Sequence, residues 1–250
     1  MELFTLPVFA VTIPAVIFAG ISKGGFGSGV AFASSSILAI ALDPGIAIGL
    51  MLPLLMLIDV TSLPAYWRKW DWGVAKVLLW GGIPGTILGA LFYAWANPDA
   101  IRLIIGLVAL LFVAWQLAVK YKLIRLGAKF GPGVGLGAGV ALGFTSFVSH
   151  AGGPAAAVYM LGQGMSKTRY QATTVLIFWA VNLFKSGFYA GMGIFTTQTL
   201  LLGLALAPFA ILGTWLGIKA HKMIPERAFF GVTYVALTLT GAKLVWDALT

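Results

Sequence analysis

The chain contains the segment GISKGGFGSG at residues 20–29 and the segment GFTSFVSHAGGP at residues 143–154. Both lie within long apolar stretches, where glycine pairs and polar residues interrupt the pattern of a continuous helix. The two segments are about half a chain length apart, so each half of the sequence contains one interruption. This arrangement predicts a chain built from two related halves, each with a broken helix.

Further positions repeat between the halves with a similar spacing. Asp59 corresponds to Asn182 and Tyr66 to Tyr189, each at an offset of 123 residues. Other correspondences, at offsets of 124 or 125, link Pro84 with Pro208, Ile87-Leu88-Gly89 with Ile211-Leu212-Gly213, Arg102 with Arg227, and Gly106 with Gly231. Internal duplication with broken helices at matching places is typical of secondary transporters, which hold substrate where the breaks meet. The sequence therefore predicts a transporter with one integral membrane domain, in which residues 1–125 form the first transmembrane repeat and residues 126–250 the second.

The composition is that of a membrane protein. Hydrophobic residues make up 60% of the chain and charged residues 9%. So few charged residues cannot provide the polar surface that a soluble protein needs. The apolar runs are roughly 17 to 25 residues long and can cross a hydrocarbon core about 30 Å thick. We expect an all-α polytopic membrane protein with about five helical elements in each repeat. The expected elements lie at residues 5–22, 27–42, 45–66, 73–95, 101–119, 131–149, 152–163, 170–192, 198–218 and 228–247.

The net charge of +9 would suggest a nucleic-acid partner if the protein were soluble. Here the basic residues lie in short connections between apolar runs, so the expected partner is the lipid bilayer and not nucleic acid. The chain has no cysteine, which excludes disulfides and thiol chemistry, and its two histidines are not spaced for a metal. No metal and no cofactor are therefore expected.

Charge also predicts the orientation of the elements. Basic connections lie at residues 68–69, 120–129, 167–169 and 219–227, whereas the connections around Asp43, residues 97–99 and residues 196–198 are not basic. The positive-inside rule places the basic set, with the central 120–129 connection, in the cytoplasm and both termini outside. With five elements each, the halves then have opposite orientations and form two inverted repeats. Glu2 and the lack of a basic n-region predict that no signal peptide is cleaved.

The first two elements of each repeat are expected to form a short hairpin with its glycine-rich tip inside the protein. Residues 152–163 make a helix of only about 18 Å, which is too short to cross the bilayer. Such a hairpin is re-entrant, and its non-helical tip is acceptable only where other helices or a wet cavity surround it. In the alternative interpretation, residues 5–22 form a plain span with Lys23 at its cytoplasmic end.

The glycine-rich breaks suit a small oxyanion. A helix that restarts after a break presents unpaired backbone N–H groups and the positive end of its dipole, and elements 27–42 and 152–163 are expected to restart in this way. Glycine lets a ligand approach the backbone, and serine hydroxyls add donors. The alternative is that the glycines only permit tight helix packing. The expected substrate-binding residues are Ser22, Lys23, Gly24, Gly25, Gly27, Ser28, Ser146, Ser149, His150, Gly152, Gly153, Asn182 and Lys185.

Several ionisable residues fall within or near the expected membrane segments. Lys23 and Lys185 can supply the counter-charge for an anion, or can extend to the cytoplasmic and outer surfaces respectively. Asp59 is expected either to pair with a lysine or to bind a proton. His150 is expected either to couple protons to transport or to be a hydrogen-bonded structural residue. Asp59 and His150 are thus the candidate coupling or gating residues, whereas His221, in a basic loop, is expected to be solvated.

The two breaks, Gly20-x-x-Lys23-Gly24-Gly25-Phe26-Gly27-x-Gly29 and Gly143-x-x-Ser146-x-x-x-x-x-Gly152-Gly153-Pro154, resemble the TauE/SafE family of membrane permeases. The similarity extends over essentially the whole chain, in its length, its duplicated halves and its basic central connection. The resemblance implies export of sulfite or an organosulfonate such as sulfoacetate, in bacteria that degrade sulfonates. It also implies a multi-pass protein of the bacterial inner membrane.

Other functions stay open on the sequence. Glycine-rich hairpins also build the filter of an anion channel, whose flux would not saturate, and the cargo could be another small anionic metabolite. An enzyme is not expected, because Ser149 and His150 are sequence neighbours and such neighbours seldom form a nucleophile–base pair. The sequence is compatible with alternating access by uniport or with proton coupling, and with a homo-oligomer.

Overall fold

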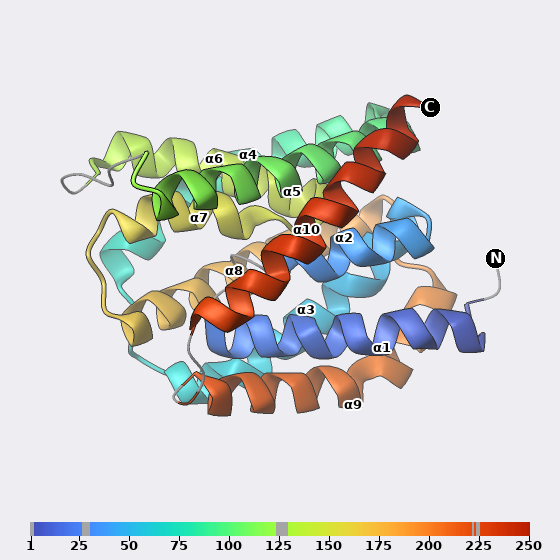
Figure 1. Cartoon of the computed structure of the whole chain (residues 1–250), viewed down its shortest axis with the longest axis horizontal. Coiled ribbons are helices and arrows are strands. Elements are labelled where there is room, and N and C mark those ends of the chain that lie inside the picture. The colour runs from blue at the N-terminus through green and yellow to red at the C-terminus, as the bar shows by residue number, and fades with distance from the viewer. Residues whose placement is uncertain (1–2, 27–30, 124–129, 222, 224–225) are drawn as a thin grey trace.

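The computed structural model describes residues 3–26, 31–123, 130–221, 223 and 226–250. This part of the chain consists of helices joined by short connections and contains no strand (Figure 1). Within it, six helices are long and apolar enough to cross a membrane, which confirms the predicted all-helical polytopic fold. The elements are α1 (Leu6–Ile21), the π-helical turn η1 (Ser22–Phe26), α2 (Phe32–Ala41), α3 (Pro44–Tyr66), α4 (Trp72–Trp95), α5 (Pro98–Lys120), α6 (Pro132–Ser149), α7 (Gly152–Leu161), α8 (Lys167–Gly191), α9 (Thr197–Ala220) and α10 (Glu226–Leu249).

Several of the long helices begin at a polar cap. The side chains of Asp43 and Asp71 accept hydrogen bonds from backbone N–H groups in the first turns of α3 and α4. Asn97 and Ser166 do the same for α5 and α8. Proline also occupies the first positions of α3, α5 and α6, where it removes no helical hydrogen bond. These residues are why the helix starts agree closely with those expected from the sequence.

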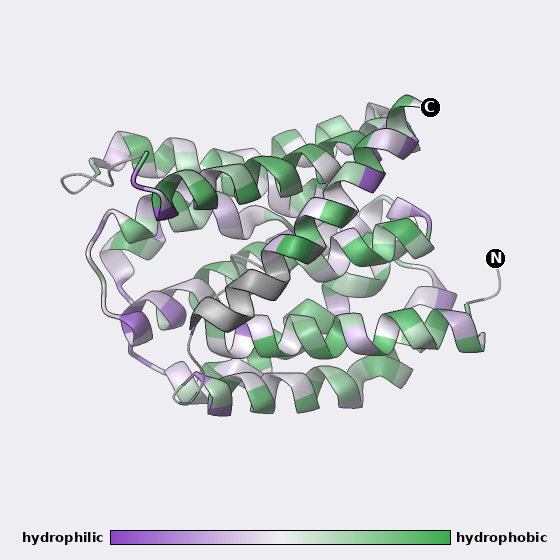
Figure 2. Cartoon of the chain, viewed as in Figure 1, coloured by the Kyte–Doolittle hydropathy of each residue, from purple (hydrophilic) through white to green (hydrophobic). Residues whose placement is uncertain are grey.

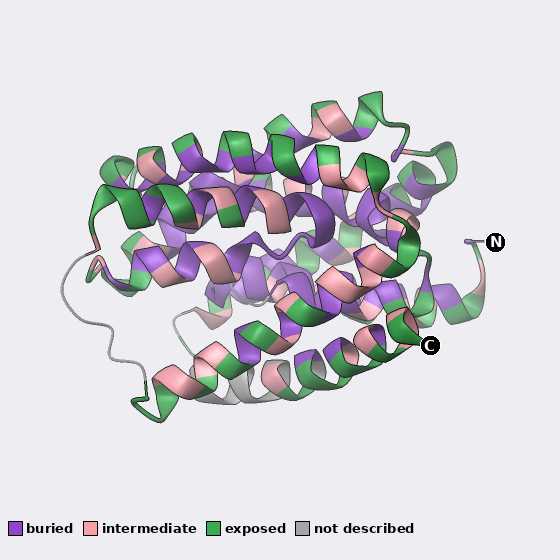
Figure 3. Cartoon of the chain, turned by 90° about the horizontal axis from the view of Figure 1, so that it is seen from above, coloured by how far each residue is buried: buried purple, intermediate pink, exposed green. Residues whose placement is uncertain are grey.

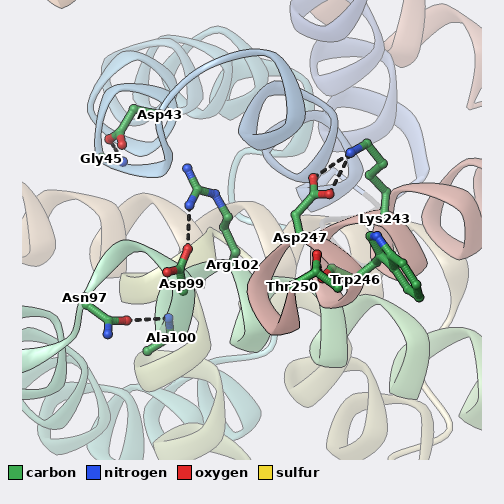
Figure 4. Close-up of polar contacts among 10 residues, drawn as sticks. All are labelled: Asp43, Gly45, Asn97, Asp99, Ala100, Arg102, Lys243, Trp246, Asp247 and Thr250. Carbon is green, nitrogen blue, oxygen red and sulfur yellow. Dashed lines mark hydrogen bonds and ion pairs between the residues drawn. The ribbon is translucent and has the colours of Figure 1, made fainter.

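Exposed polar contacts lie at one end of the bundle, each within a single helix or at its cap (Figure 4). On α5, Arg102 lies 2.7 Å from Asp99, and on α10, Lys243 lies 2.7 Å from Asp247. The caps of α3 and α5 appear in the same view. Both termini lie at one end of the bundle in Figure 1, together with the α8–α9 connection.

The described basic connections lie at the opposite end. Figure 1 shows the α3–α4 and α7–α8 connections on the left, away from both termini. These connections carry Arg68 and Lys69, and Lys167 and Arg169 follow at the start of α8. Figure 2 shows hydrophobic stretches between the polar ends. The charge asymmetry behind the predicted orientation is thus present in the fold, and the side of the membrane that each end faces stays a prediction.

The first glycine-rich segment does not break the helix where the sequence predicted. Ser22–Phe26 continue α1 as a π-helical turn, and the helix expected over residues 27–42 begins only at Phe32. Together, Leu6–Phe26 form a 21-residue segment that is long enough to span a membrane, as the plain-span alternative requires. The first helical segment therefore extends four residues beyond its expected end at residue 22.

The second glycine-rich segment reverses the chain as a helical hairpin. α6 ends at Ser149, His150 has a left-handed backbone with φ of 57°, and α7 begins at Gly152. α7 has 10 residues, about 15 Å of helix, which is too short to cross a bilayer. In the first half, residues 27–30, with the candidates Gly27 and Ser28, lie outside the described residues. A re-entrant position of either hairpin stays a prediction.

The helices of the two halves are interleaved. α1 packs on α9 and α6 packs on α4, so the first helix of each half lies against a late helix of the other. In the same way α3 packs on α9, α8 packs on α4, and α5 packs on α10. Figure 3 shows the buried faces of these helices turned toward the middle of the bundle. Each half therefore buries its surface largely against the other half.

Glycine permits the closest of these contacts. A Cβ atom at Gly20 of α1 would lie 2.7 Å from the backbone nitrogen of Thr214 on α9. A Cβ atom at Gly143 of α6 would lie 2.6 Å from the backbone nitrogen of Thr86 on α4. In a membrane, helices associate through such close packing, because lipid removes the hydrophobic driving force between them.

The packing also corrects one correspondence between the halves. Gly85 faces the carbonyl of Val140 and Gly213 faces that of Ile17. Ile17 and Val140 are corresponding residues, 123 positions apart, so the glycines that face them take the same place in the two halves. By this packing Gly213 takes the place of Gly85, 128 positions earlier, and not that of Gly89. The contact on α9 lies about one helical turn further along, and Phe209 stands one turn before Gly213.

Gly143→Ala is expected to destabilise the protein by about 1–3 kcal/mol, because the added methyl group would overpack the contact with Gly82 and Thr86. Gly137→Ala on the same helix is the matched control, since its methyl group would meet open space. Thermal unfolding in detergent should give a lower Tm for Gly143→Ala and an unchanged or higher Tm for Gly137→Ala. Equal Tm values would contradict the packing described for α4 and α6.

Candidate functional site

Buried polar side chains meet between η1 and the α6–α7 hairpin. Lys23 of η1 and Asp59 of α3 form an ion pair, with Nζ 2.7 Å from Oδ1 and 2.8 Å from Oδ2. The two side chains are 3% and 1% exposed. Lys23 therefore points into the protein and does not extend to the cytoplasmic surface. Of the two alternatives expected for Asp59, the structure shows the pair with a lysine.

Asn182 of α8 joins this pair from the second half. Its Nδ2 donates to Oδ2 of Asp59 at 2.8 Å, and the residue is buried. Asp59 and Asn182 are corresponding residues at the offset of 123, so two equivalent positions touch each other. The carboxylate thus accepts from both halves and joins η1, α3 and α8.

Lys185 of α8 is fully buried and lies beside the hairpin. Its Nζ donates to the backbone carbonyl of Ser146 at 2.8 Å and to Nδ1 of His150 at 2.8 Å, with the hydroxyl of Ser146 at 3.4 Å. Within the described residues, no ion pair joins Lys185 to a carboxylate. Lys185 therefore does not reach the outer surface, and its ammonium group has polar partners but no paired counter-charge.

His150 is held at both ring nitrogens. Nε2 lies 3.0 Å from the carbonyl of Ile48 on α3, which can only accept, so Nε2 carries the proton. Nδ1 is then the acceptor for Lys185, and the ring is neutral. We refer to this group of residues as the central cluster: Lys23, Asp59, Ser146, His150, Asn182 and Lys185.

A small cavity lies within the central cluster. Its volume is about 10 Å³, and it is lined by Lys23, Ala31, Leu55, Ser146, His150, Phe178 and Asn182. That volume is enough for about one water molecule. The site is thus closed in this structure, with polar groups from both halves turned toward the same small space.

A larger cavity, which we call the basic-end vestibule, has a volume of about 380 Å³. Its walls include Gly25, Lys167, Gln171 and His221. Gln171 links it to the central cluster, because its Nε2 donates to the backbone carbonyl of Lys23. His221 is half-buried and its Nδ1 donates to the carbonyl of Gly25, so the expectation of a solvated His221 was wrong.

The other candidates of the first break lie next to the cluster. The carbonyl of Gly24 accepts a hydrogen bond from the hydroxyl of Tyr66 at 2.6 Å, and that of Gly25 accepts one from His221. Both glycines also pack against the backbone of α9. Their contacts agree with the alternative that the glycines of this segment permit tight helix packing. Ser22 is fully buried in the same turn.

In the second break, the candidates other than Ser146 and His150 support the hairpin. The hydroxyl of Ser149 donates to the carbonyl of Thr145 one turn earlier, at 2.9 Å. A Cβ atom at Gly152 would lie 3.0 Å from Cβ of Ser146, so Gly152 brings α7 close to α6. Gly153 is buried in the first turn of α7.

Sequence reasoning assigned no role to two tyrosines that brace the site. The hydroxyl of Tyr66 donates to the carbonyl of Gly24, and the hydroxyl of Tyr189 donates to the carbonyl of Phe147 at 2.5 Å. Both pairs of residues are related by the offset of 123, so the repetition of tyrosine was the signal available. Gln171, near the start of α8, carried no such signal.

Asp59→Leu is expected to destabilise the protein by about 3–5 kcal/mol, because it leaves the buried Lys23 without a counter-charge. The double variant Lys23→Met/Asp59→Leu replaces the pair with apolar side chains and should recover most of that loss. Unfolding of the single and double variants in detergent measures the coupling between the two residues. Strictly additive losses would argue against a direct pair.

The family described as Sulfite exporter TauE/SafE matches residues 12–244, which is nearly the whole chain. No curated protein and no solved structure matches the chain.

Proposed function

The chain belongs to the Sulfite exporter TauE/SafE family, and on that premise we propose that it exports a small oxyanion across the bacterial inner membrane by alternating access. Members of this family are membrane transporters and not enzymes, and the chain is a multi-pass membrane protein. The proposed cargo is sulfite or an organosulfonate. The observation that carries this proposal is the fully buried ammonium group of Lys185, which has no paired carboxylate among the described residues.

A buried charge without a counter-charge is costly in a membrane protein and is typically functional. The carboxylate of Asp59 balances Lys23, which leaves the charge of Lys185 for an anion to balance. The hydroxyl of Ser146 and the amide of Asn182 add neutral donors at the edge of the cavity. Trigonal or tetrahedral oxyanions have several acceptor atoms, which suits donors that converge from different helices.

Two helix starts support the same position for the anion. Ala31, which precedes α2, lines the small cavity, and α7 starts two residues after His150. Helix N-termini favour anions through unpaired N–H groups and the helix dipole. In this proposal the short helices stabilise the oxygens of the anion, while Lys185 supplies the full charge.

Paired contacts support two repeats, residues 1–125 and 126–250, related by a pseudo-two-fold axis. The hydrogen bond from Tyr66 to Gly24 has its counterpart in the bond from Tyr189 to Phe147. The axis would pass near Asp59 and Asn182, the corresponding residues that touch each other. The exchanged packing of α1 on α9 and α6 on α4 has the same symmetry.

The two ends of the bundle differ in how a cavity there connects to the central cluster. The basic-end vestibule of about 380 Å³ is linked to the central cluster through Gln171, which lines it and donates to the carbonyl of Lys23. We assign this conformation to a closed state that has this vestibule toward the cytoplasm.

The closed cavity favours a transporter over the rival anion channel. A channel needs a continuous path in its conducting state, whereas a transporter passes through closed states. The membrane potential, negative inside, drives an anion outward, so uniport is sufficient for export. Proton coupling through His150 would require its Nδ1 to release Lys185 first.

Lys185→Met is expected to abolish saturable sulfite efflux from proteoliposomes, because it removes the unbalanced positive charge. Lys243→Met, which removes a paired lysine at the bundle surface, is the matched control and should retain efflux. Efflux would be measured under a membrane potential with no pH gradient. Saturable efflux by folded Lys185→Met protein at the wild-type rate would overturn this site.

The orientation can be tested with single cysteines, since the chain has none of its own. Ser166→Cys lies at the basic end and Gln198→Cys at the opposite end, and both positions are exposed. A membrane-impermeant thiol reagent should label Gln198→Cys in intact cells and Ser166→Cys only after lysis. The reverse pattern would invert the proposed topology.

A further inference from the structure

The charges of the central cluster restrict the charge of the cargo. We infer that the site takes a singly charged oxyanion, such as hydrogensulfite or a monosulfonate, and disfavours doubly charged ones. This inference rests on the proposed function, because it assumes that the central cluster binds the transported anion. It narrows the cargo within the oxyanions already proposed.

We assign the charge of each residue from its hydrogen bonds, with Lys185 taken as an ammonium group. Lys23 donates to Oδ2 of Asp59, and its Nζ also lies 2.7 Å from Oδ1, which is the geometry of an ammonium–carboxylate pair with no net charge. Lys185 has three N–H groups and faces three acceptors, two on Ser146 and one on His150. His150 is neutral, because the carbonyl of Ile48 fixes the proton on Nε2.

No further charge compensates this group within the described part of the chain. The lysine and aspartate side chains buried there are Lys23, Asp59 and Lys185. Two positive groups and one negative group leave a single positive charge. The other polar neighbours, Asn182 and Ser146, are neutral.

A singly charged anion makes the loaded site neutral, whereas a dianion leaves one negative charge in surroundings from which water is excluded. An uncompensated charge in such surroundings is strongly unfavourable, and it should shift relative binding by about tenfold or more. Sulfate and sulfoacetate carry two negative charges at neutral pH. Hydrogensulfite and methanesulfonate carry one.

The first test uses the wild-type protein in proteoliposomes. Methanesulfonate and sulfate compete with labelled sulfite at equal concentration, and the inhibition constants are compared. We expect methanesulfonate to inhibit at about tenfold lower concentration than sulfate or sulfoacetate. Equal or stronger inhibition by sulfate would overturn the inference, while leaving the oxyanion exporter intact. Absence of saturable efflux with any of these anions would instead refute the proposed function.

The second test changes the charge of the site. Asp59→Asn raises the charge of the cluster by one, so the preference should shift toward sulfate by about tenfold. Asp99→Asn makes the same change at an exposed position and should leave the ratio of inhibition constants unchanged. Asn182→Asp lowers the cluster charge by one and should weaken inhibition by methanesulfonate. An unchanged ratio of inhibition constants in folded Asp59→Asn or Asn182→Asp protein would contradict the inference. If neither variant folds, the competition measured with the wild-type protein decides whether the inference holds.

Discussion

An ammonium group in the middle of a membrane-spanning bundle must find its acceptors within the protein, because lipid offers none. Lys185 finds them on the α6–α7 hairpin, in Ser146 and His150, and so holds α8 against the hairpin tip. Lys23 finds its acceptor in Asp59, which ties η1 to α3. These two requirements bring both glycine-rich segments to one place, and they leave one positive charge there for an anion to balance.

The close helix packing makes this convergence possible. Gly20 and Gly143 let α1 and α6 approach the backbones of α9 and α4, so each half is built into the other. A motion of one half would therefore change the packing of the other. The glycine contact on α9 lies about one helical turn further along than the contact on α4, so the two halves are built into each other at different positions.

Hydropathy and charge predicted the helices well, since each membrane-spanning helix needs an apolar run and its ends need polar or helix-starting residues. Repetition located Asp59 and Asn182, and the breaks located Lys23, Ser146 and His150, all of which meet in the structure. The π-helical turn at η1 was not predictable, because it depends on how α9 packs there. The register of Gly213 and the contact of His221 depend on the same tertiary packing, which no local pattern encodes.

The most direct test of the central claim is to locate the bound anion. Selenite is a heavier analogue of sulfite, and its selenium gives an anomalous X-ray signal in crystals of the purified protein. We expect one strong peak in the small cavity of the central cluster, within hydrogen-bonding distance of Ser146 and Asn182, which is lost in Lys185→Met. A peak only in the basic-end vestibule beside Lys167, or at full strength in Lys185→Met, would contradict it.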